Sequence, residues 1–340
     1  MALVPYDALL LVSFGGPEGP DDVMPFLRNV VRGRDVPEER IAEVAQHYQR
    51  FGGVSPINAQ CRSLLAALRP VLDEAGIDLP LYWGNRNWHP YLNDEVARMA
   101  AAGVRRALAF ATSPYGSYSS CRQYLEDIDQ ARAAVGPDAP EIDKIRHYHD
   151  HPGHIAPHAD AVRTALADLD GLDPADVRLV FTAHSIPSTM DANSGPDGGR
   201  YHEQLHETAT LVAQQATPGL AWDLVWQSRS GPPQVPWLEP DINDHLEGLA
   251  AARVRGVVVS PIGFISDHLE VIWDLDHEAA QTAQRLGVRY VRAATPGTDP
   301  RFVAMVRDLV LERLDPATPR PRLGQLPVWD VCPTGCCLSR

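Results

Sequence analysis

The feature that most constrains the fold of this chain is a regular alternation between short apolar runs and longer amphipathic stretches. The amphipathic stretches carry helix-boundary residues, such as Pro37 before "EERIAEVAQHYQRF" and Gly103 after "YLNDEVARMAAA". Alternating strands and helices are typical of parallel sheets that helices cover on both faces. The expected strands are, in chain order, Ala8–Phe14, Pro80–Gly84, Arg106–Thr112, Asp143–Tyr148, Arg178–His184, Ala221–Ser228, Arg255–Ile262 and Gly287–Ala293.

Two local patterns recur in the two halves of the chain. "ALAFATSPYG" and "VVVSPIG" both run from a strand into Ser-Pro-x-Gly, at Ser113–Gly116 and Ser260–Gly263, and "LLLVSFGGP" resembles "LVFTAHSIP". We therefore expect an α/β protein of two Rossmann-like domains, each with a four-stranded parallel sheet, around a ligand cleft. The expected divisions are 1–150 for the N-terminal domain, 151–315 for the C-terminal domain, and 316–340 for a proline-rich linker and a cysteine tail.

Charge and motifs exclude several classes of function. The net charge is −14 and no basic stripe is present, so nucleic acid is not an expected partner. A G-x-G-x-x-G fingerprint would need a glycine at Phe14, and no P-loop pattern occurs, so no nucleotide is expected. The first residues show no signal peptide, and "ALLLV" is far shorter than the roughly 20 apolar residues of a membrane span. We expect a cytoplasmic protein.

Two groups of chemically active residues follow expected strands. His184 ends "RLVFTAH", and "SDHLE" follows "VVVSPIGFI" with His268 and Glu270, so an imidazole and a carboxylate meet at one sheet edge. Such a pair binds Fe²⁺ or moves protons, although a helix-capping His184 and a Glu270 paired with an arginine are an equal alternative. "HYHDHPGHIAPH", from His147 to His158, is expected to be a solvent-exposed connection between a strand and a helix.

Five sequence blocks together resemble the ferrochelatase family: "LVSFGGPEG", "FGGVSPIN", "TAHSIP", "WQSRSGPPQVPWLEP" and "SPIGFISDHLEVIWDLD". They occur in the family's order over nearly the whole chain. The resemblance implies two four-stranded halves around a porphyrin cleft, and a lyase of haem biosynthesis that inserts Fe²⁺ into a porphyrin with release of two protons. It also implies that His184 and Glu270 are the catalytic, metal-binding pair, and that His268, Asp274 and Asp276 continue an acidic face that passes iron or protons inward.

The resemblance also implies residues for the porphyrin propionates. Ser55 in "GGVSP" and Tyr124 in "YSSCRQY" match bacterial members of the family, and Arg32 and Arg34 are further candidates because guanidinium groups suit carboxylates. An exposed helix end is the alternative for the two arginines. Phe14 departs from some coproporphyrin-type relatives, in which a tyrosine at this position ligates the product iron, so axial ligation must differ here.

Three of the five cysteines lie in the C-terminal stretch "VCPTGCC". Three thiols in a reducing compartment do not predict a disulfide. Some ferrochelatases hold a [2Fe–2S] cluster on three C-terminal cysteines and one from the body, and the resemblance implies such a cluster here, with structural zinc and an idle tail as alternatives. Cys61 is expected to be a buried thiol. The implied iron–sulfur ligands are Cys121, Cys332, Cys336 and Cys337.

The resemblance is to soluble bacterial members, and no hydrophobic membrane lip is evident, so coproporphyrin III is favoured over protoporphyrin IX as substrate. A sirohydrochlorin-type chelatase and a non-catalytic haem-binding or haem-delivery protein are the alternatives. The expected partners are a porphyrin and ferrous iron, bound by a monomer that makes only transient contacts with other enzymes of the haem pathway.

Overall fold

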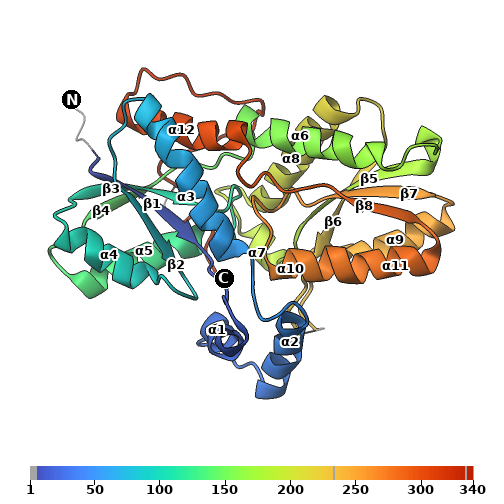
Figure 1. The fold of residues 1–340 in the computed structure, drawn as a ribbon, viewed down its shortest axis with the longest axis horizontal. Helices are drawn as coiled ribbons and strands as arrows, with labels where there is room; N and C mark the ends of the chain where they lie inside the picture. Colours follow the sequence, from blue (N-terminus) through green and yellow to red (C-terminus); the bar gives the residue numbers. More distant parts are fainter. Residues whose placement is uncertain (1–5, 233, 334, 340) are drawn as a thin grey trace.

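The computed structural model describes residues 6–232, 234–333 and 335–339, and these residues form two four-stranded parallel sheets. Residues 1–5, part of the stretch in which no signal peptide is expected, lie outside the described residues. The strands follow the same order in both sheets, and Figure 1 shows the sheets side by side. The first sheet is ordered β2-β1-β3-β4 and the second β6-β5-β7-β8; the strands are β1 Ala8–Ser13, β2 Leu81–Asn85, β3 Arg106–Ala111, β4 Glu141–Lys144, β5 Val177–His184, β6 Trp222–Gln227, β7 Gly256–Ser260 and β8 Arg289–Arg292.

This architecture confirms the predicted fold class, and the strands lie within a few residues of their predicted positions. The largest difference is at β4, which pairs with β3 over Glu141–Lys144 instead of continuing to Tyr148. The chain leaves the sheet there because the Tyr148 side chain turns inward, where its hydroxyl donates to the Ala111 carbonyl at 2.9 Å.

Helices cover both faces of each sheet, and apolar side chains fill the four layers between them. The first sheet packs against α3 on one face and against α4 and α5 on the other. The second packs against α6 and α8 on one face and against α9 and α11 on the other. The helices are α1 Val23–Val30, α2 Glu38–Arg50, α3 Ile57–Glu74, α4 Leu92–Ala101, α5 Gln123–Val135, α6 Pro152–Ala167, α7 Ser188–Ala192, α8 Arg200–Ala216, α9 Ile242–Ala251, α10 Leu269–Val271, α11 Ala280–Leu286 and α12 Pro300–Leu314, with 3₁₀ turns η1 Pro20–Asp22 and η3 Pro174–Asp176 and π-helices η2 Tyr118–Arg122 and η4 Ile272–Ala279.

The last helix, α12, returns to the first half of the molecule. Phe302 and Val306 share a core with Leu64 and Leu68 of α3, and α12 also contacts α6 (Figure 1). The segment that the sequence assigns to the C-terminal domain therefore contributes its final helix to the core of the first sheet. The chain after α12 turns back toward the middle of the molecule.

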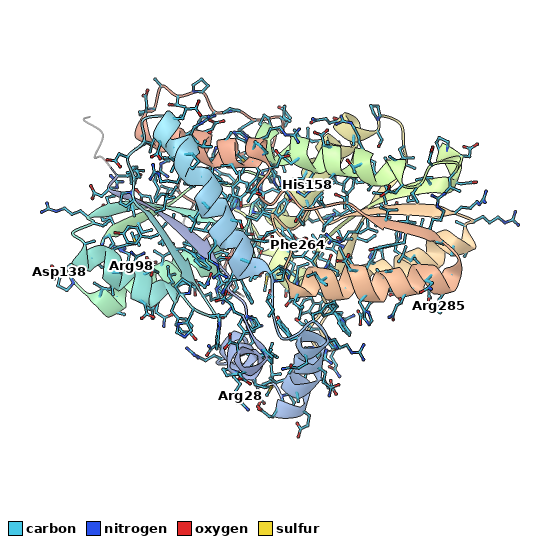
Figure 2. The ribbon with its side chains drawn as sticks, in the orientation of Figure 1. Arg28, Arg98, Asp138, His158, Phe264 and Arg285 are labelled. Atoms are coloured by element: carbon cyan, nitrogen blue, oxygen red, sulfur yellow. The ribbon has the colours of Figure 1, made fainter. Side chains whose placement is uncertain are left out.

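The histidine-rich segment is buried, so the prediction of a solvent-exposed connection is wrong. Its histidines lie on α6 or in the segment just before it, and α6 is sandwiched between α8 and α12, where Figure 2 labels His158. The return of α12 from the end of the chain explains the burial, because Phe302 packs against the His154 ring at 6.2 Å. The buried histidines are His147, His149, His151, His154 and His158.

The two matching Ser-Pro-x-Gly turns meet where the halves join. The Tyr115 hydroxyl of the first turn donates to the Ile262 carbonyl of the second at 2.7 Å, and Tyr115 is almost fully buried. The carboxyl ends of β3 and β7 therefore face one region between the sheets. No helix within the described ranges is long and apolar enough to cross a membrane.

Candidate functional site

His184 is the last residue of β5, and the loops around it fix its backbone. The Tyr201 hydroxyl donates to the His184 carbonyl at 2.9 Å, and the Ser185 amide donates to the Gln227 carbonyl at 2.7 Å. The ring Nδ1 lies 2.5 Å from the Ser185 carbonyl oxygen. Because a carbonyl only accepts hydrogen bonds, Nδ1 carries the hydrogen and Nε2 of the neutral ring presents a lone pair.

Glu270 reaches the same place from the neighbouring strand, β7. It lies on α10, just after the loop that follows β7, and its Oε2 is 3.6 Å from His184 Nε2. The two side chains are 33% and 45% exposed, so both remain open to a ligand. A lone pair and a carboxylate that face each other at this distance suit a divalent metal ion or the capture of protons.

A row of carboxylates continues from Glu270 along η4. Asp274 and Glu278 follow at four-residue intervals, and Asp274 accepts hydrogen bonds from the Ser228 hydroxyl and from Gln227 Nε2 at 3.3 Å. Burial, together with the charges of Glu270 and Glu278, raises the pKa of Asp274 to about 7. Asp274 therefore exchanges its proton near neutral pH. Sequence reasoning missed Glu278, which the spacing Glu-x₃-Asp-x₃-Glu could have indicated.

The other two groups expected on this acidic face have different surroundings. Asp276 pairs with the Arg292 guanidinium at 2.5 Å, and Arg292 also holds Asp267 at 3.1 Å, so the structure turns this aspartate away from the Glu270 row. The His268 ring packs edge-on against Phe264, which Figure 2 labels between the two halves. Burial lowers the pKa of His268.

Aromatic side chains from the first half reach over η4. The His47 ring of α2 stacks on the Trp273 ring with centroids 3.8 Å apart, and Phe51 meets the same indole edge-on at 6.3 Å. Arg50 covers Trp273 as well, with its guanidinium carbon 5.3 Å from the ring centroid. Figure 1 shows that α1 and α2 project from the body of the molecule below α10, the short helix that precedes η4. A flat aromatic ligand would find an aromatic wall here.

The block "WQSRSGPPQVPWLEP" supports the loop that carries His184. A Cβ on Gly231 would lie 2.4 Å from the Trp237 ring nitrogen, so only glycine permits this contact. The Leu238 amide donates to the Ile186 carbonyl at 3.0 Å, and the Ser185 hydroxyl donates to the Leu238 carbonyl at 2.8 Å. These contacts explain why an unusual glycine–proline sequence lies next to the candidate site.

Comparison with known proteins shows the family to which this chain belongs. The family model for ferrochelatase matches residues 6–314. The chain belongs to the ferrochelatase family. A Nocardia farcinica protein named coproporphyrin III ferrochelatase is 59% identical over 97% of this chain and 96% of its own length, and one from Streptomyces griseus is 54% identical over 99% and 94%. A protein from Rhodopirellula baltica named ferrochelatase is also 54% identical over 99% and 94%.

A solved structure of SirB from Bacillus subtilis with Fe³⁺ matches 91% of this chain and 96% of its own, with a TM-score of 0.52 and 14% identity. At this identity the likeness shows the fold alone. It agrees with the two-sheet arrangement described above.

In this ferrochelatase, Ser55 lies where two glycine-rich blocks pack together. The Ser55 amide donates to the Pro17 carbonyl at 2.9 Å, and a Cβ on Gly16 would lie 2.7 Å from the Ser55 Cβ. A bridge between Glu18 and Val54 joins the same two loops. Phe14 lies beside this region, and its ring packs edge-on against the Phe26 ring, with the two ring centroids 6.2 Å apart.

The other expected propionate-binding residues lie elsewhere in the first half. Tyr124 lies on α5 and its side chain is buried in the core between α5 and the first sheet. The Arg86 guanidinium carbon lies 4.3 Å from its ring centroid. Arg32 is exposed after α1, with its guanidinium 2.5 Å from Asn29 Oδ1, and it borders a hollow at the carboxyl end of β2. Arg34 is exposed in the following turn. Their roles stay predictions.

The tail cysteines fold back onto Cys121, which is buried on η2. Cys332 lies near Cys121 and Cys336, and the sulfurs of Cys336 and Cys337 are 3.4 Å apart. The neighbouring thiols Cys121 and Cys336 lower the pKa of Cys332, whereas its neighbour Cys332 raises the pKa of Cys121. The four cysteines predicted to act together therefore lie in one region of the structure, and their role as ligands stays a prediction. Cys61 is buried on α3, and burial raises its pKa to about 11.

His149, Asp150 and Glu207 form a second polar group, which the sequence did not indicate. Within the described ranges it is the one set of three candidate ligand atoms that lie within 4.8 Å of one another. Its carboxylates are already engaged: Glu207 accepts the amides of Gln325 and Leu326 at 2.6 and 3.1 Å. His149 Nε2 meets the other Glu207 oxygen at 3.0 Å.

Asp150 holds the same part of the linker, because its Oδ2 accepts a hydrogen bond from Arg322 Nε at 2.7 Å. Burial acts to raise the pKa of Glu207, but hydrogen bonds from His149 and the two linker amides lower it to about 2. We therefore interpret His149, Asp150 and Glu207 as a latch that holds the linker, and call them the tail latch. The latch fastens the segment that brings the cysteines to Cys121.

Proposed function

We propose that this protein inserts Fe²⁺ into coproporphyrin III, with release of two protons, as a step of haem biosynthesis in the cytoplasm. The observation that carries the proposal is the His184–Glu270 pair, open to solvent at the strand ends of a chain that belongs to the ferrochelatase family. The choice of coproporphyrin rests on relatives that bear that name at 59% and 54% identity.

The chemistry explains why such a site needs these groups. A free-base porphyrin is flat and carries protons on its central nitrogens, so iron enters only when the ring bends and the protons leave. A site complementary to the bent ring lowers that barrier. The His184 Nε2 lone pair and the Glu270 carboxylate would bind the incoming iron and receive the protons, and Asp274, with a pKa of about 7, would pass them on.

The porphyrin would lie against the aromatic wall of His47, Phe51 and Trp273, with its propionates toward the first half. Ser55, Tyr124, Arg32 and Arg34 are the proposed propionate-binding residues. Coproporphyrin III carries more propionates than protoporphyrin IX, so charged and hydroxyl donors around the ring would favour it.

The decisive experiment compares turnover of coproporphyrin III and protoporphyrin IX with Fe²⁺ under anaerobic conditions, followed by absorption spectroscopy. We expect the free-base bands of coproporphyrin to be replaced by metalloporphyrin bands, with a higher kcat/KM than for protoporphyrin. Faster turnover of protoporphyrin would overturn the substrate assignment. Tight haem binding without any turnover would favour the haem-delivery alternative.

We also propose that Cys121, Cys332, Cys336 and Cys337 hold a [2Fe–2S] cluster, because four thiolates are the ligands that such a cluster requires. A zinc ion with Zn–S bonds of about 2.3 Å would need all four sulfurs within roughly 3.8 Å of one another. No three cysteine sulfurs of the described chain lie within 4.8 Å of one another, so either group would draw the sulfurs closer together on binding.

The cluster proposal has its own test. Protein purified without oxygen should be brown and contain iron and sulfide in equal amounts, and Cys121→Ser or Cys332→Ser should remove the colour. Colourless protein without iron or sulfide would refute the cluster, and bound zinc would select the alternative. Because the cysteines lie apart from the His184–Glu270 pair, the result does not bear on iron insertion.

A further inference from the structure

Ser228, which directly follows β6, has a backbone conformation that residues other than glycine rarely adopt. Its φ angle is 61°, in the left-handed region. Of the residues that the structure describes, the other non-glycine residues with a positive φ are Arg253 and Cys337. Glycine would fit this position without strain, so the presence of a serine needs a separate reason. Strain of this kind is concentrated at functional sites, and β6 is the neighbour of the strand that ends in His184.

The Ser228 hydroxyl supplies that reason, because it donates a hydrogen bond to Oδ2 of Asp274. Gln227 Nε2 donates to the same oxygen at 3.3 Å, and Gln227 is completely buried. Two donors therefore converge on one of the two carboxyl oxygens of Asp274. An oxygen that accepts two hydrogen bonds is held as an acceptor, so the exchangeable proton of Asp274 is carried by Oδ1.

The end of β6 also contacts the loop that carries His184. Gln227 lies opposite His184 in the paired strands β5 and β6, and its backbone carbonyl accepts the Ser185 amide at 2.7 Å. Backbone groups thus make the contact with the His184 loop, whereas side chains make the contact with Asp274. A side-chain substitution of Ser228 consequently alters the contact with Asp274 and leaves the His184 loop in place.

We propose that Ser228 is a positioning residue for iron insertion, whose hydroxyl, together with the Gln227 amide, holds Asp274 Oδ2 so that Oδ1 takes up and releases the porphyrin protons. The inference rests on the proposed function, in which Asp274 passes these protons on. Each proton leaves its electron pair on a porphyrin nitrogen, where the pair binds the iron. The proton reaches Oδ1 through the His184–Glu270 pair, and water then takes it from Oδ1. Ser228 acts through Asp274 and touches no reacting atom.

The first test is Ser228→Gly, which removes the hydroxyl and leaves a residue that suits the left-handed backbone. We expect urea unfolding to show no loss of stability. The kcat should be lower by about tenfold, as for the loss of a hydrogen bond to a carboxylate, with an unchanged KM for porphyrin. Arg253→Gly is the matched control, because exposed Arg253 has a φ of 67° and precedes the start of β7, at the opposite edge of the sheet from the site. It should leave kcat unchanged.

A double-mutant comparison shows whether Ser228 acts through Asp274. Ser228→Gly should cause no further loss of kcat when Asp274 is already asparagine, because the group that it positions is absent. An equal loss of kcat in the Asp274→Asn protein and in the unaltered protein would overturn the role of Ser228. An unchanged kcat in the single variant Ser228→Gly would overturn it as well.

Infrared spectroscopy provides a readout that does not need turnover. At pH 6 most Asp274 is protonated, because its pKa is about 7. Its C=O stretching band, identified by its absence in Asp274→Asn, should lie at higher wavenumber in Ser228→Gly, because the carbonyl oxygen loses a donor. An unshifted band would overturn the proposed contact. A lack of turnover by the unaltered protein would instead refute iron insertion, while the band would still decide whether Ser228 holds Asp274.

Discussion

His184 Nε2 and Glu270 Oε2 lie 3.6 Å apart, although the two residues come from the ends of different strands and are 86 positions apart in the chain. The pair forms because β5 and β7 are neighbours in a parallel sheet, so their carboxyl ends meet at the same edge. The hydrogen bond from His184 Nδ1 to the Ser185 carbonyl directs the free lone pair toward the carboxylate. His184 therefore supplies a nitrogen lone pair and Glu270 a carboxylate, and single substitutions can remove the two groups one at a time.

His184→Ala should abolish iron insertion while leaving the fold and porphyrin binding intact. The side chain is one third exposed, so its removal leaves no large buried cavity, but the site loses its nitrogen lone pair. We expect kcat to fall by about 100-fold or more, with porphyrin binding measured by fluorescence quenching. His206→Ala, an exposed histidine of α8, is the control. Near-normal turnover by His184→Ala would refute its role.

Glu270→Gln should also be severely impaired, because an amide neither accepts the proton nor offers a negative charge to the metal. The substitution keeps the size of the side chain, so a lost packing contact would not explain the effect. We expect a lower kcat with little change in the KM for porphyrin, measured by steady-state kinetics. If activity is retained, the carboxylate role belongs to Asp274, one turn further along.

Asp274→Asn should change the pH dependence of iron insertion. The pKa of about 7 means that the carboxyl group is protonated below neutral pH and ionised above it. If the ionised form accepts the protons, the rate of the unaltered enzyme should fall as the pH decreases from 8 to 6. Asp274→Asn should be slower and should lose this limb of the kcat profile. An unchanged profile in the variant would assign the limb to another group.

The parts of this structure that the sequence predicted depend on local pattern. β5 and β7 are mostly apolar and buried, so their ends, and hence His184 and Glu270, could be located from the sequence. Resemblance, and not residue pattern, gave the reaction and the set of four cysteines. The buried His154 and the tail latch could not be predicted, because they depend on α12 and the linker returning from the far end of the chain.

His158→Leu should reduce the loss of stability at acidic pH. Burial lowers the pKa of His158 to about 3, well below its ordinary value of 6.5, so the folded protein keeps this ring neutral while the unfolded chain binds a proton. Stability from this neutral ring is present above pH 6.5 and is lost as the pH falls toward 3. The cost is about 2 kcal/mol by pH 5.

Urea unfolding of both proteins at pH 7.5 and 5 would measure this effect. The free energy of unfolding of His158→Leu should rise by about 2 kcal/mol relative to the unaltered protein between these two pH values. His206→Asn, which changes an exposed histidine, should show no such relative gain. Equal pH dependence in all three proteins would contradict the assignment to His158.

Arg322→Ala should loosen the tail without unfolding the protein. Arg322 links the linker to the buried Asp150 at 2.7 Å and also donates to the Leu326 carbonyl, so its removal takes one contact from the tail latch and leaves Glu207 in place. Weakening the docked tail by roughly 1.4 kcal/mol would raise the fraction of undocked tail about tenfold.

Cys332 and its neighbours should then react about tenfold faster with a thiol reagent in cluster-free protein, measured against Arg285→Ala. Arg285 pairs with Glu247 on the surface, as Figure 2 shows for its exposed position, and its loss should not affect the cysteines. Equal labelling rates in the two variants would mean that the latch does not hold the tail, and that the contacts among the cysteines alone keep it folded onto Cys121.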